Sequence, residues 1–561
     1  MKTFISLFSA LLFLLLLFSL FKNISYPLLW NDESMTAYGA EVVLEYGYPK
    51  VHGERNVFYD LLHTNPTIGI NEKDDAFVGS SSWGQYYYSI IGHKLAEQTD
   101  DLYTKTGILR STYAIAGLLG MLFLAFIAMR FLPGALSRNA FVALFLLVSL
   151  ISISQTLHLR EVRYYALALL LSSIIIGLYI WFRFYKPFNK IVFILLETAA
   201  LWLAFVTWSP LFAVALFSMG VSELVIFVDR YKKDAFAGAL QHAWPALVLA
   251  IVATVSIIPM MVEFKYFELS SAIAEFTGYS AKIYWDNISV LFDHFKKQEL
   301  LFVAIAMKIF LLCYVKKIRI QNPTLFKVSC FLTLYFLISY FITARIPHDA
   351  SGRYIIYLQP ALSVIIIFDL FMVLYNARNK QQHTLKNSKK NATVAVNKNY
   401  ITPKMAFPLI VFALLFSYTL FNNMHKIKGH VYEMFHQYKG PLDYTIPYIK
   451  ENFPRADTLV IAANYEEYSY MYYLGSKVIV GYVGNNLEED AKLVPDIVAY
   501  RKMWPHFAGL FNHYFSKARY EPVSFPIFDN PVNNSPGFDN AQYPLFNHRF
   551  KTFHTENPRQ A

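Results

Sequence analysis

The chain has 561 residues, of which 55% are hydrophobic, 17% aromatic and only 16% charged. A soluble domain is typically about 45–50% apolar and about 25% charged, so this composition excludes an ordinary soluble enzyme and indicates a membrane protein. Both cysteines, Cys313 and Cys330, fall in or beside apolar runs. A disulfide-stapled fold and a cysteine-rich metal site are therefore excluded as well.

Eleven apolar runs approach the roughly 17–25 helical residues that are needed to cross a hydrocarbon core of about 30 Å. The sequence therefore predicts a polytopic all-α membrane protein with about eleven transmembrane helices. In chain order the runs are Phe4–Phe21, Ile108–Phe131, Phe141–Leu157, Tyr165–Phe182, Ile191–Trp208, Phe212–Val228, Trp244–Val262, Leu300–Val315, Val328–Ala344, Ile355–Tyr375 and Phe407–Phe421. Ten runs follow the first one, so we expect it to remain as an uncleaved anchor.

The net charge of +11 is distributed unevenly over the gaps between the runs. Alternate gaps are basic, with Arg183, Lys186 and Lys190 in one of them, and the linker Arg378–Lys404 belongs to the same set. Basic loops mark the cytoplasmic face, so the amino terminus is expected inside and the carboxy terminus outside. The excess charge then sets the orientation in the membrane. It is not the basic face of a nucleic-acid-binding domain, and no nucleic acid partner is expected.

Three sizeable segments lie on the predicted outer face. They are the first extracytoplasmic loop over residues 22–107, a loop from Glu263 to Glu299, and a tail over residues 422–561. The tail is long enough to fold on its own and predicts an extracytoplasmic α/β domain, separate from a transmembrane domain over residues 1–421. Its predicted elements are a helix through Ile449 capped by Asp443, a strand Thr458–Ala462, a helix Glu466–Leu474 and a strand Lys477–Val480. After Gly481, the Pro- and Asn-rich composition predicts irregular chain.

A pair of carboxylates, Asp32 and Glu33, stands shortly after the first run. The amphipathic pattern of Ser34–Tyr46 predicts a helix at the membrane interface with Asp32 near its amino end. Acidic residues also favour that position simply because they cap helices, so a purely structural role for Asp32 stays open.

Two basic clusters lie in short loops on the same predicted face. The first contains Arg160, Glu161 and Arg163, followed by two tyrosines. Arginine binds phosphate oxygens in pairs and keeps its charge, so this cluster is a candidate phosphate site. Contact with lipid headgroups by the arginine side chains is the alternative.

The second basic cluster contains Arg345, His348, Arg353 and Tyr354. A basic loop on the outer face opposes the usual charge distribution, and an anionic ligand is the simplest explanation for it.

Polar and aromatic residues ahead of the second run are candidate contacts for a sugar. They are Trp83, Gln85 and Tyr87, which together with Glu161 we assign to sugar or acceptor binding. The aromatic members are equally suited to anchoring the protein at the interface.

Four ionisable residues fall inside the apolar runs, where a functional role is the default hypothesis. They are Glu197, Glu223, Lys308 and Asp369. Asp369 is the deepest, and we expect it to make a polar contact between helices, with a relay in a transporter as the alternative.

The order of these features resembles the GT-C glycosyltransferase superfamily. The resemblance rests on an Asp-Glu pair in a long outer loop, then Trp83-Gly-Gln-Tyr-Tyr-Tyr88, then Arg160-Glu-Val-Arg-Tyr-Tyr-Ala-Leu167, and a late Arg353-Tyr354 before Pro360. The chain is most similar to bacterial polyprenyl-phosphate-sugar transferases of the protein-mannosyltransferase and aminoarabinose-transferase type. Two family motifs are missing, namely the Lys-Pro-Pro-Leu stretch of the aminoarabinose branch and the Trp-Trp-Asp-Tyr-Gly signature of oligosaccharyltransferases. The acceptors of those branches are therefore not transferred to this chain.

The resemblance implies an inverting transferase in the bacterial inner membrane. Its donor would be a sugar on a polyprenyl phosphate, and its acceptor a hydroxyl of an envelope lipid, glycan or protein. Asp32 would be the general base, with Glu33 as the second candidate. The donor phosphate would be bound by Arg160, Arg163, Arg345, His348, Arg353 and Tyr354. No cofactor is required, although a divalent metal is possible. A transporter or flippase, and a polysaccharide polymerase or ligase, are the alternative functions.

Overall fold

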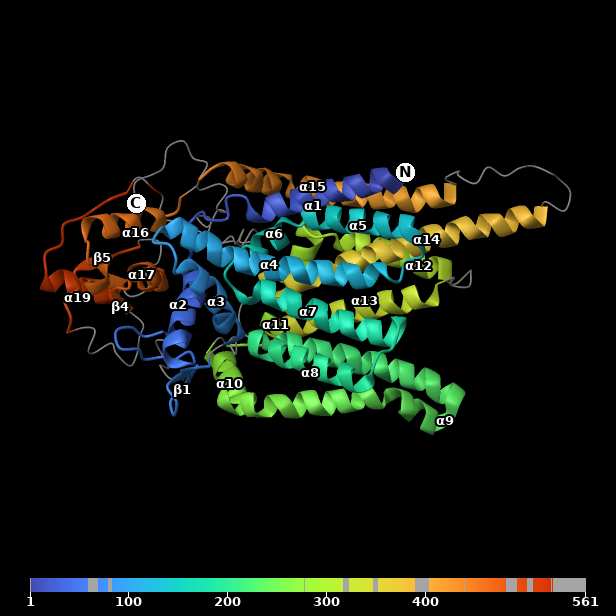
Figure 1. Ribbon diagram of the computed structural model, residues 1–561, viewed down its shortest axis with the longest axis horizontal. Coiled ribbons are helices and arrows are strands. Elements are labelled where there is room, and N and C mark those ends of the chain that lie inside the picture. Colours follow the sequence, from blue (N-terminus) through green and yellow to red (C-terminus); the bar gives the residue numbers. More distant parts are fainter. Residues whose placement is uncertain are drawn as a thin grey trace.

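The computed structural model describes residues 2–58, 69–78, 83–276, 278–315, 322–346, 352–388, 403–437, 439–480, 492–501, 508–525 and 527. Figure 1 shows a long bundle of helices with a small α/β unit at one end. The N-terminus belongs to the bundle, and the α/β unit is built from the last part of the chain.

Within the described residues, nine helical segments are long and apolar enough to cross a membrane. They belong to α1 (Lys2–Phe21), α4 (Leu102–Met129), α5 (Gly134–Ile151), α7 (Tyr164–Ile180) with the π-turn η1 (Trp181–Tyr185), α8 (Lys190–Thr207), α9 (Ser209–Glu263), α13 (Pro323–Thr343), η2 (Gly352–Leu358) with α14 (Gln359–Ser388), and α15 (Pro403–Phe435). The chain is a multi-pass membrane protein, as predicted.

Two further features reconcile these segments with the eleven apolar runs. Helix α9 has 55 residues and is interrupted at Ala235, whose φ of 58° and ψ of −175° are not helical. The chain reverses there, so α9 contains two antiparallel membrane-length halves (Figure 1). The short apolar helix α12 (Leu301–Val315) accounts for the remaining run.

Two of the differences between the predicted and the observed boundaries have a clear local cause. Helix α4 begins at Leu102, ahead of the predicted Ile108, because the Asp101 side chain accepts a hydrogen bond from the Thr104 amide and caps the helix. The run Phe141–Leu157 is broken at Ser152, where α5 ends and the short helix α6 (Ile153–Leu159) begins. Both differences arise from polar caps that an apolar count does not detect.

The first outer loop folds across the end of the bundle. It contains α2 (Asn31–Tyr46), a small hairpin of β1 (Ile70–Asn71) and β2 (Ala76–Phe77), and α3 (Trp83–Ala96). Helix α2 confirms the predicted helix and ends at Gly47, whose φ of 85° suits glycine. Figure 1 shows α2 and α3 between the membrane helices and the α/β unit. The helices α10 (Tyr266–Phe276) and α11 (Ala281–Gln298) lie near the same end.

The α/β unit contains a three-stranded parallel sheet in the order β4-β3-β5. Its elements are α16 (Leu442–Asn452), η4 (Ala456–Thr458), β3 (Val460–Ala463), α17 (Glu467–Leu474), β4 (Lys477–Val480), β5 (Ile497–Ala499) and α19 (Ala508–Lys517). The two predicted strands and the helix between them are confirmed. The prediction of irregular chain after Gly481 is wrong for β5 and α19, because a three-residue strand is too short to show periodicity.

Three contacts tie the α/β unit to the segment that leads into α2. Asp443 accepts a hydrogen bond from the Leu28 amide at 3.0 Å, and the Tyr473 hydroxyl accepts one from the Leu29 amide at 3.0 Å. The hydroxyls of Ser34 and Ser469 are 2.7 Å apart. The predicted domain boundary at residue 421 falls inside α15, which continues to Phe435. The division into two domains otherwise remains a prediction.

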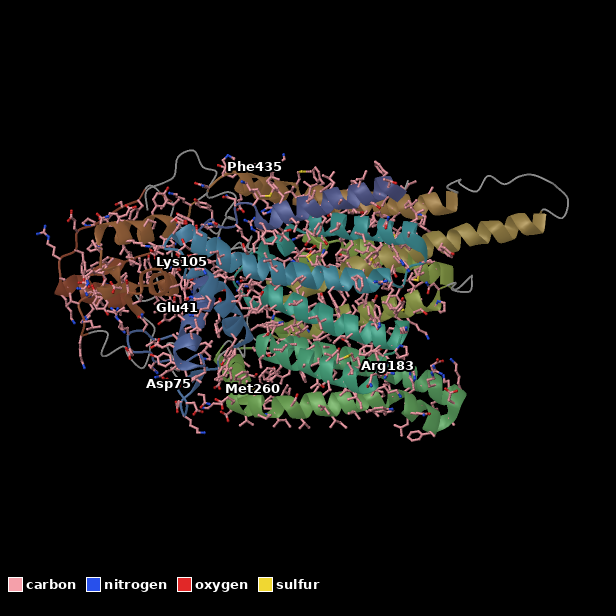
Figure 2. The ribbon with its side chains drawn as sticks, viewed as in Figure 1. Glu41, Asp75, Lys105, Arg183, Met260 and Phe435 are labelled. Carbon is pink, nitrogen blue, oxygen red and sulfur yellow. The ribbon has the colours of Figure 1, made fainter. Side chains whose placement is uncertain are left out.

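The charged loops lie at opposite ends of the bundle. Figure 2 shows Glu41, Asp75 and Lys105 at the end that carries the α/β unit, whereas Arg183 lies toward the other end. Which of the two ends faces the cytoplasm remains a prediction from the basic gaps between the apolar runs.

Candidate active site

Three distant segments of the chain meet at Asp32. The Arg353 Nη1 atom lies 3.4 Å from Asp32 Oδ2, and the Arg163 Nη2 atom lies 3.9 Å from the same oxygen. The three side chains are partly exposed, at 23% for Asp32, 16% for Arg163 and 19% for Arg353. A carboxylate thus faces two guanidinium groups in a site that a ligand can reach.

Backbone conformation and hydrogen bonds to neighbouring residues hold the two arginine side chains in place. Arg163 is the residue before α7 and has an extended backbone, and its Nη1 atom donates to the Asp32 carbonyl at 3.2 Å and to Thr36 Oγ1 at 3.3 Å. Burial is the largest single influence on the pKa of Arg163 and lowers it, but Asp32 and the neighbouring tyrosines Tyr165, Tyr86 and Tyr164 together raise it by more, so the net shift is upward. Arg353 lies in η2 and donates from Nη2 to the Tyr354 hydroxyl at 3.3 Å.

Glu33 points to a different partner, so its predicted role as a second catalytic carboxylate remains a prediction that its contacts do not favour. It is fully buried and accepts two hydrogen bonds from Arg110, at 2.8 Å from Nε and 2.6 Å from Nη2. Glu33 Oε1 also accepts from the Val162 amide at 3.0 Å. A closed bidentate pair of this kind leaves no oxygen for a substrate. The hydrogen bond from the Val162 amide to Glu33 holds the backbone next to Arg163 in place.

Glu161 and Gln85 also support the site from within the protein. Glu161 accepts from the Trp30 indole at 3.2 Å and contacts His158 Nδ1 at 2.8 Å, which fixes the residue that precedes α2. Gln85 Oε1 accepts from the Tyr164 amide at 3.2 Å and from Thr36 Oγ1 at 3.4 Å. Both side chains are buried, so the sugar contacts predicted for them remain predictions that their burial does not favour.

An aromatic stack stands beside the arginines. The Tyr164 and Trp208 rings are stacked at 4.8 Å, and the Trp208 and Tyr354 rings at 5.6 Å. The Arg163 and Arg353 guanidinium groups lie 5.7 Å and 5.2 Å from the rings of Tyr164 and Tyr354. These cation–π contacts help to keep the guanidinium groups pointing at one place.

Three of the predicted site residues donate hydrogen bonds to backbone carbonyls of other segments. Arg160 donates to the carbonyls of Ser19, Lys22 and Asn23, so it caps the carboxyl end of α1. Trp83 donates its indole N–H to the Phe77 carbonyl, and the Tyr87 hydroxyl donates to the Gly47 carbonyl.

Arg345 is exposed just beyond the end of α13, and no contact between it and Asp32 is recorded among the described residues. Another predicted phosphate-binding residue, His348, lies outside the described residues.

Other residues of the site were missed by the sequence analysis. Arg110 stands inside an apolar run, where an arginine is itself a signal of a buried partner. Trp208 stands at the break before Ser209-Pro210. The contribution of the α/β unit depends on its docking against α2, for which no local signal exists.

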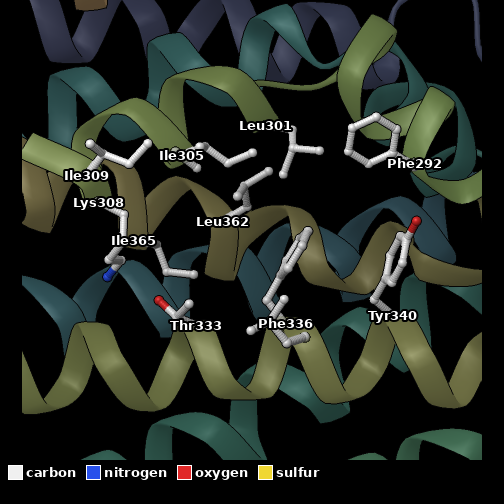
Figure 3. Close-up of a pocket in the computed structure, with 12 residues that line it drawn as sticks. Phe292, Leu301, Ile305, Lys308, Ile309, Thr333, Phe336, Tyr340, Leu362 and Ile365 are labelled. Carbon is white, nitrogen blue, oxygen red and sulfur yellow. The ribbon is translucent and has the colours of Figure 1, made fainter.

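An apolar groove of about 300 Å³ runs between α12, α13 and α14. Figure 3 shows Phe292 and Tyr340 at one end of it and Lys308 and Ile309 at the other. Ile305, Ile309 and Leu337 are 42%, 54% and 47% exposed, so the groove opens toward the lipid. Its lining residues are Phe292, Leu301, Ala304, Ile305, Lys308, Ile309, Thr333, Phe336, Leu337, Tyr340, Leu362 and Ile365.

Elements of the groove are connected to the site around Asp32. Helix α11, which supplies Phe292, packs against η2, and the His294 ring leaves no room for a side chain at Gly352, next to Arg353. At the far end, Lys308 lies 2.8 Å from Asp369, and Ser329 donates to the same carboxylate at 2.5 Å. The predicted polar contact of Asp369 between helices is therefore present.

No protein-family model matches the sequence. No curated protein matches it either. Several solved structures are similar in fold. ArnT from Cupriavidus metallidurans bound to undecaprenyl phosphate has 13% identity and a TM-score of 0.50, with 88% of each chain covered. Its apo state has 13% identity and a TM-score of 0.46, with 88% of this chain and 89% of that one covered. The apo oligosaccharyltransferase from Archaeoglobus fulgidus has 11% identity and a TM-score of 0.47, with 84% of this chain and 64% of that one covered.

Proposed function

Since the chain has the fold of the GT-C glycosyltransferases, we propose that it is a membrane glycosyltransferase with a polyprenyl-phosphate-sugar donor. It moves the sugar to a hydroxyl of a cell-envelope lipid, glycan or protein on the extracytoplasmic face of the inner membrane. The observation that carries this proposal is the partly exposed Asp32 carboxylate facing Arg163 and Arg353. The bound undecaprenyl phosphate of the ArnT structure supports the class of donor.

In this proposal Asp32 is the general base. It takes the proton of the acceptor hydroxyl as that oxygen forms a bond with the anomeric carbon. The bond between the anomeric carbon and the phosphate oxygen breaks at the same time, and the lipid phosphate leaves with the electron pair. A single displacement of this kind inverts the anomeric configuration.

Arg163 and Arg353 bind the donor phosphate and stabilise the charge that develops on it. Their contacts with Asp32, at 3.9 Å and 3.4 Å, are longer than a closed charge-assisted pair of about 2.7–2.9 Å. A phosphate can therefore replace Asp32 as the partner of these guanidinium groups, which releases the carboxylate for the acceptor. The Tyr354 hydroxyl, next to Arg353, is a further donor to the phosphate in this proposal.

The groove between α12, α13 and α14 holds the prenyl tail of the donor. It is apolar, opens toward the lipid and packs against the elements that carry Arg353. A chain whose phosphate is bound at Arg353 can thus keep its tail in the hydrocarbon layer. The tail already lies in lipid before it binds, so its contacts with the groove contribute through van der Waals packing and not through transfer out of water.

The proposal is tested with the purified full-length protein in lipid nanodiscs. Undecaprenyl phosphates linked to radiolabelled glucose, mannose, galactose or aminoarabinose are offered together with membranes of the source organism as acceptor. We expect label to move from at least one donor to membrane material with the wild type and the Asp100→Asn control, whose side chain is exposed. Asp32→Asn is expected to transfer the label about 10²–10⁴-fold more slowly. Full transfer by Asp32→Asn would remove Asp32 from the base role.

A further inference from the structure

The carboxyl edge of the small parallel sheet meets the site around Asp32. Strand β3 lies between β4 and β5, so the chain leaves β3 toward one neighbour and returns on its other side. Open parallel sheets bind ligands outside the carboxyl ends of their strands, where the strand order changes direction. Asn464 and Arg501 follow the carboxyl ends of β3 and β5.

Asn464, Glu466 and Arg501 form a clamp of hydrogen bonds and an ion pair that fixes this edge of the sheet. The Asn464 amide donates to the Arg501 carbonyl at 3.0 Å, and its oxygen accepts from the Arg501 amide at 2.8 Å. The Arg501 guanidinium forms an ion pair with Glu466. Glu466 has a φ of 60°, which is unfavourable for a non-glycine residue and persists only where the surroundings impose it. The clamp thus determines the direction in which the next residue, Glu467, leaves the loop.

Glu467 is a buried carboxyl group in the first turn of α17, the helix that packs against α2. It is 5% exposed, and its Oε2 atom has no hydrogen-bond partner among the described residues. Ser34 follows Asp32 by two residues and Ser469 follows Glu467 by two residues, and the two serine hydroxyls are 2.7 Å apart. The first turns of α2 and α17 are therefore in contact, and both carry a carboxylate.

The electrostatics of the pair agree with this geometry. Burial, with smaller contributions from the negative charges of Glu466 and Asp32, raises the pKa of Glu467 to about 7. A buried carboxyl oxygen without a partner is costly, and proteins keep such groups where a ligand uses them.

We propose that Glu467 of the α/β unit binds the acceptor hydroxyl group together with Asp32, an inference that rests on the proposed glycosyltransferase function. Inverting displacement places the acceptor and the leaving phosphate on opposite sides of the anomeric carbon. The membrane part supplies the guanidinium groups for the phosphate, and the α/β unit supplies a carboxylate, which repels a phosphate and accepts a hydrogen bond from a hydroxyl. The α/β unit therefore belongs to the acceptor side of the site.

The test compares Glu467→Gln, Glu467→Asp and the exposed control Glu451→Gln in the full-length protein. The amounts of labelled undecaprenyl-phosphate sugar and of source-organism membranes are varied separately, which gives an apparent KM for donor and acceptor. Binding of undecaprenyl phosphate is measured as well. We expect Glu467→Gln to raise the acceptor KM at least tenfold, while the donor KM and undecaprenyl phosphate affinity change less than twofold. Glu467→Asp should recover part of the loss, and Glu451→Gln should match the wild type.

A wild-type acceptor KM in Glu467→Gln, or an equal rise of both KM values, would show that Glu467 only holds the fold and would overturn the inference. A wild-type protein that transfers none of the sugars contradicts the proposed function itself, and the inference falls with it. The two failures are therefore distinguished by the wild-type measurement.

Discussion

The Arg353 Nη1 atom lies 3.4 Å from Asp32 Oδ2, although 321 residues separate the two in the chain. The neighbouring pair, Glu33 and Arg110, is bound at 2.6 Å and 2.8 Å and is almost completely buried. Two adjacent carboxylates thus face two arginines in different ways. The buried pair is closed and structural, whereas the open pair can exchange partners when a ligand binds.

Because the Glu33–Arg110 pair is closed and buried, we expect substitutions of Glu33 and of Asp32 to change the stability of the protein by different amounts. Glu33→Gln leaves the buried Arg110 charge without its partner, which typically costs about 3–5 kcal/mol. We expect a clear drop in the thermal midpoint of detergent-purified Glu33→Gln, measured by tryptophan fluorescence. Asp32→Asn should stay close to the wild type, because Asp32 is partly exposed and loosely paired. Equal losses in both variants would contradict the assignment.

The two guanidinium groups predict the behaviour of lysine substitutions. Lysine keeps the positive charge but not the planar fork that binds two phosphate oxygens. Arg163→Lys and Arg353→Lys are therefore expected to weaken undecaprenyl phosphate binding about tenfold each, which corresponds to about 1.4 kcal/mol. Isothermal titration in nanodiscs measures this, with Arg130→Lys at the end of α4 as the control. Unchanged affinity in both variants would exclude them from phosphate binding.

The groove predicts a dependence on the length of the donor tail. Ile305→Trp and Leu337→Trp fill the groove, so the KM for an undecaprenyl donor should rise at least tenfold. The KM for a donor with a ten-carbon prenyl tail should change little, because a short tail does not need the whole groove. Ile258→Trp on α9 is exposed outside the groove and serves as the control. Equal effects on long and short donors would contradict the assignment.

The pKa of Glu467 predicts a pH-dependent stability. Its carboxyl group titrates at about 7 in the folded protein, against 4.5 as its ordinary value. The folded state therefore holds the proton more tightly than the unfolded state. Its stability falls as the pH rises from 4.5 through 7, by about 3 kcal/mol in total.

Glu467→Gln removes this titration. We expect the thermal midpoints of Glu467→Gln and the wild type to differ most at pH 8, with the variant higher, and this excess to shrink toward pH 5. Glu451→Gln should show the same small difference from the wild type at both pH values. A pH-independent difference for Glu467→Gln would show that its pKa is not raised.

Much of the fold follows from local sequence. The apolar runs, the helix after Asp32 and the first α/β elements are set by periodicity and by glycines such as Gly47 and Gly475, and the structure contains them. The meeting of Asp32, Arg163 and Arg353 follows from the family resemblance, which implies one site that contains both the base and the phosphate-binding arginines.

The rest depends on tertiary contacts that have no local signature. Arg160 and Arg163 stand three residues apart in one motif, yet the first caps α1 and the second faces Asp32. The sequence suggests Glu33 as a second catalytic carboxylate, but in the structure Arg110 of another helix forms an ion pair with it. Glu467 enters the site because α17 docks on α2, which no spacing along the chain encodes.

The most direct test of the central claim compares binding and turnover in Asp32→Asn. If Asp32 is the base and only a temporary partner of the arginines, its loss lowers the rate of transfer by about 10²–10⁴-fold. Undecaprenyl phosphate should bind this variant at least as tightly as the wild type, because the competing negative charge is gone. A variant that loses phosphate affinity in proportion to its rate, or that keeps the wild-type rate, would contradict the account.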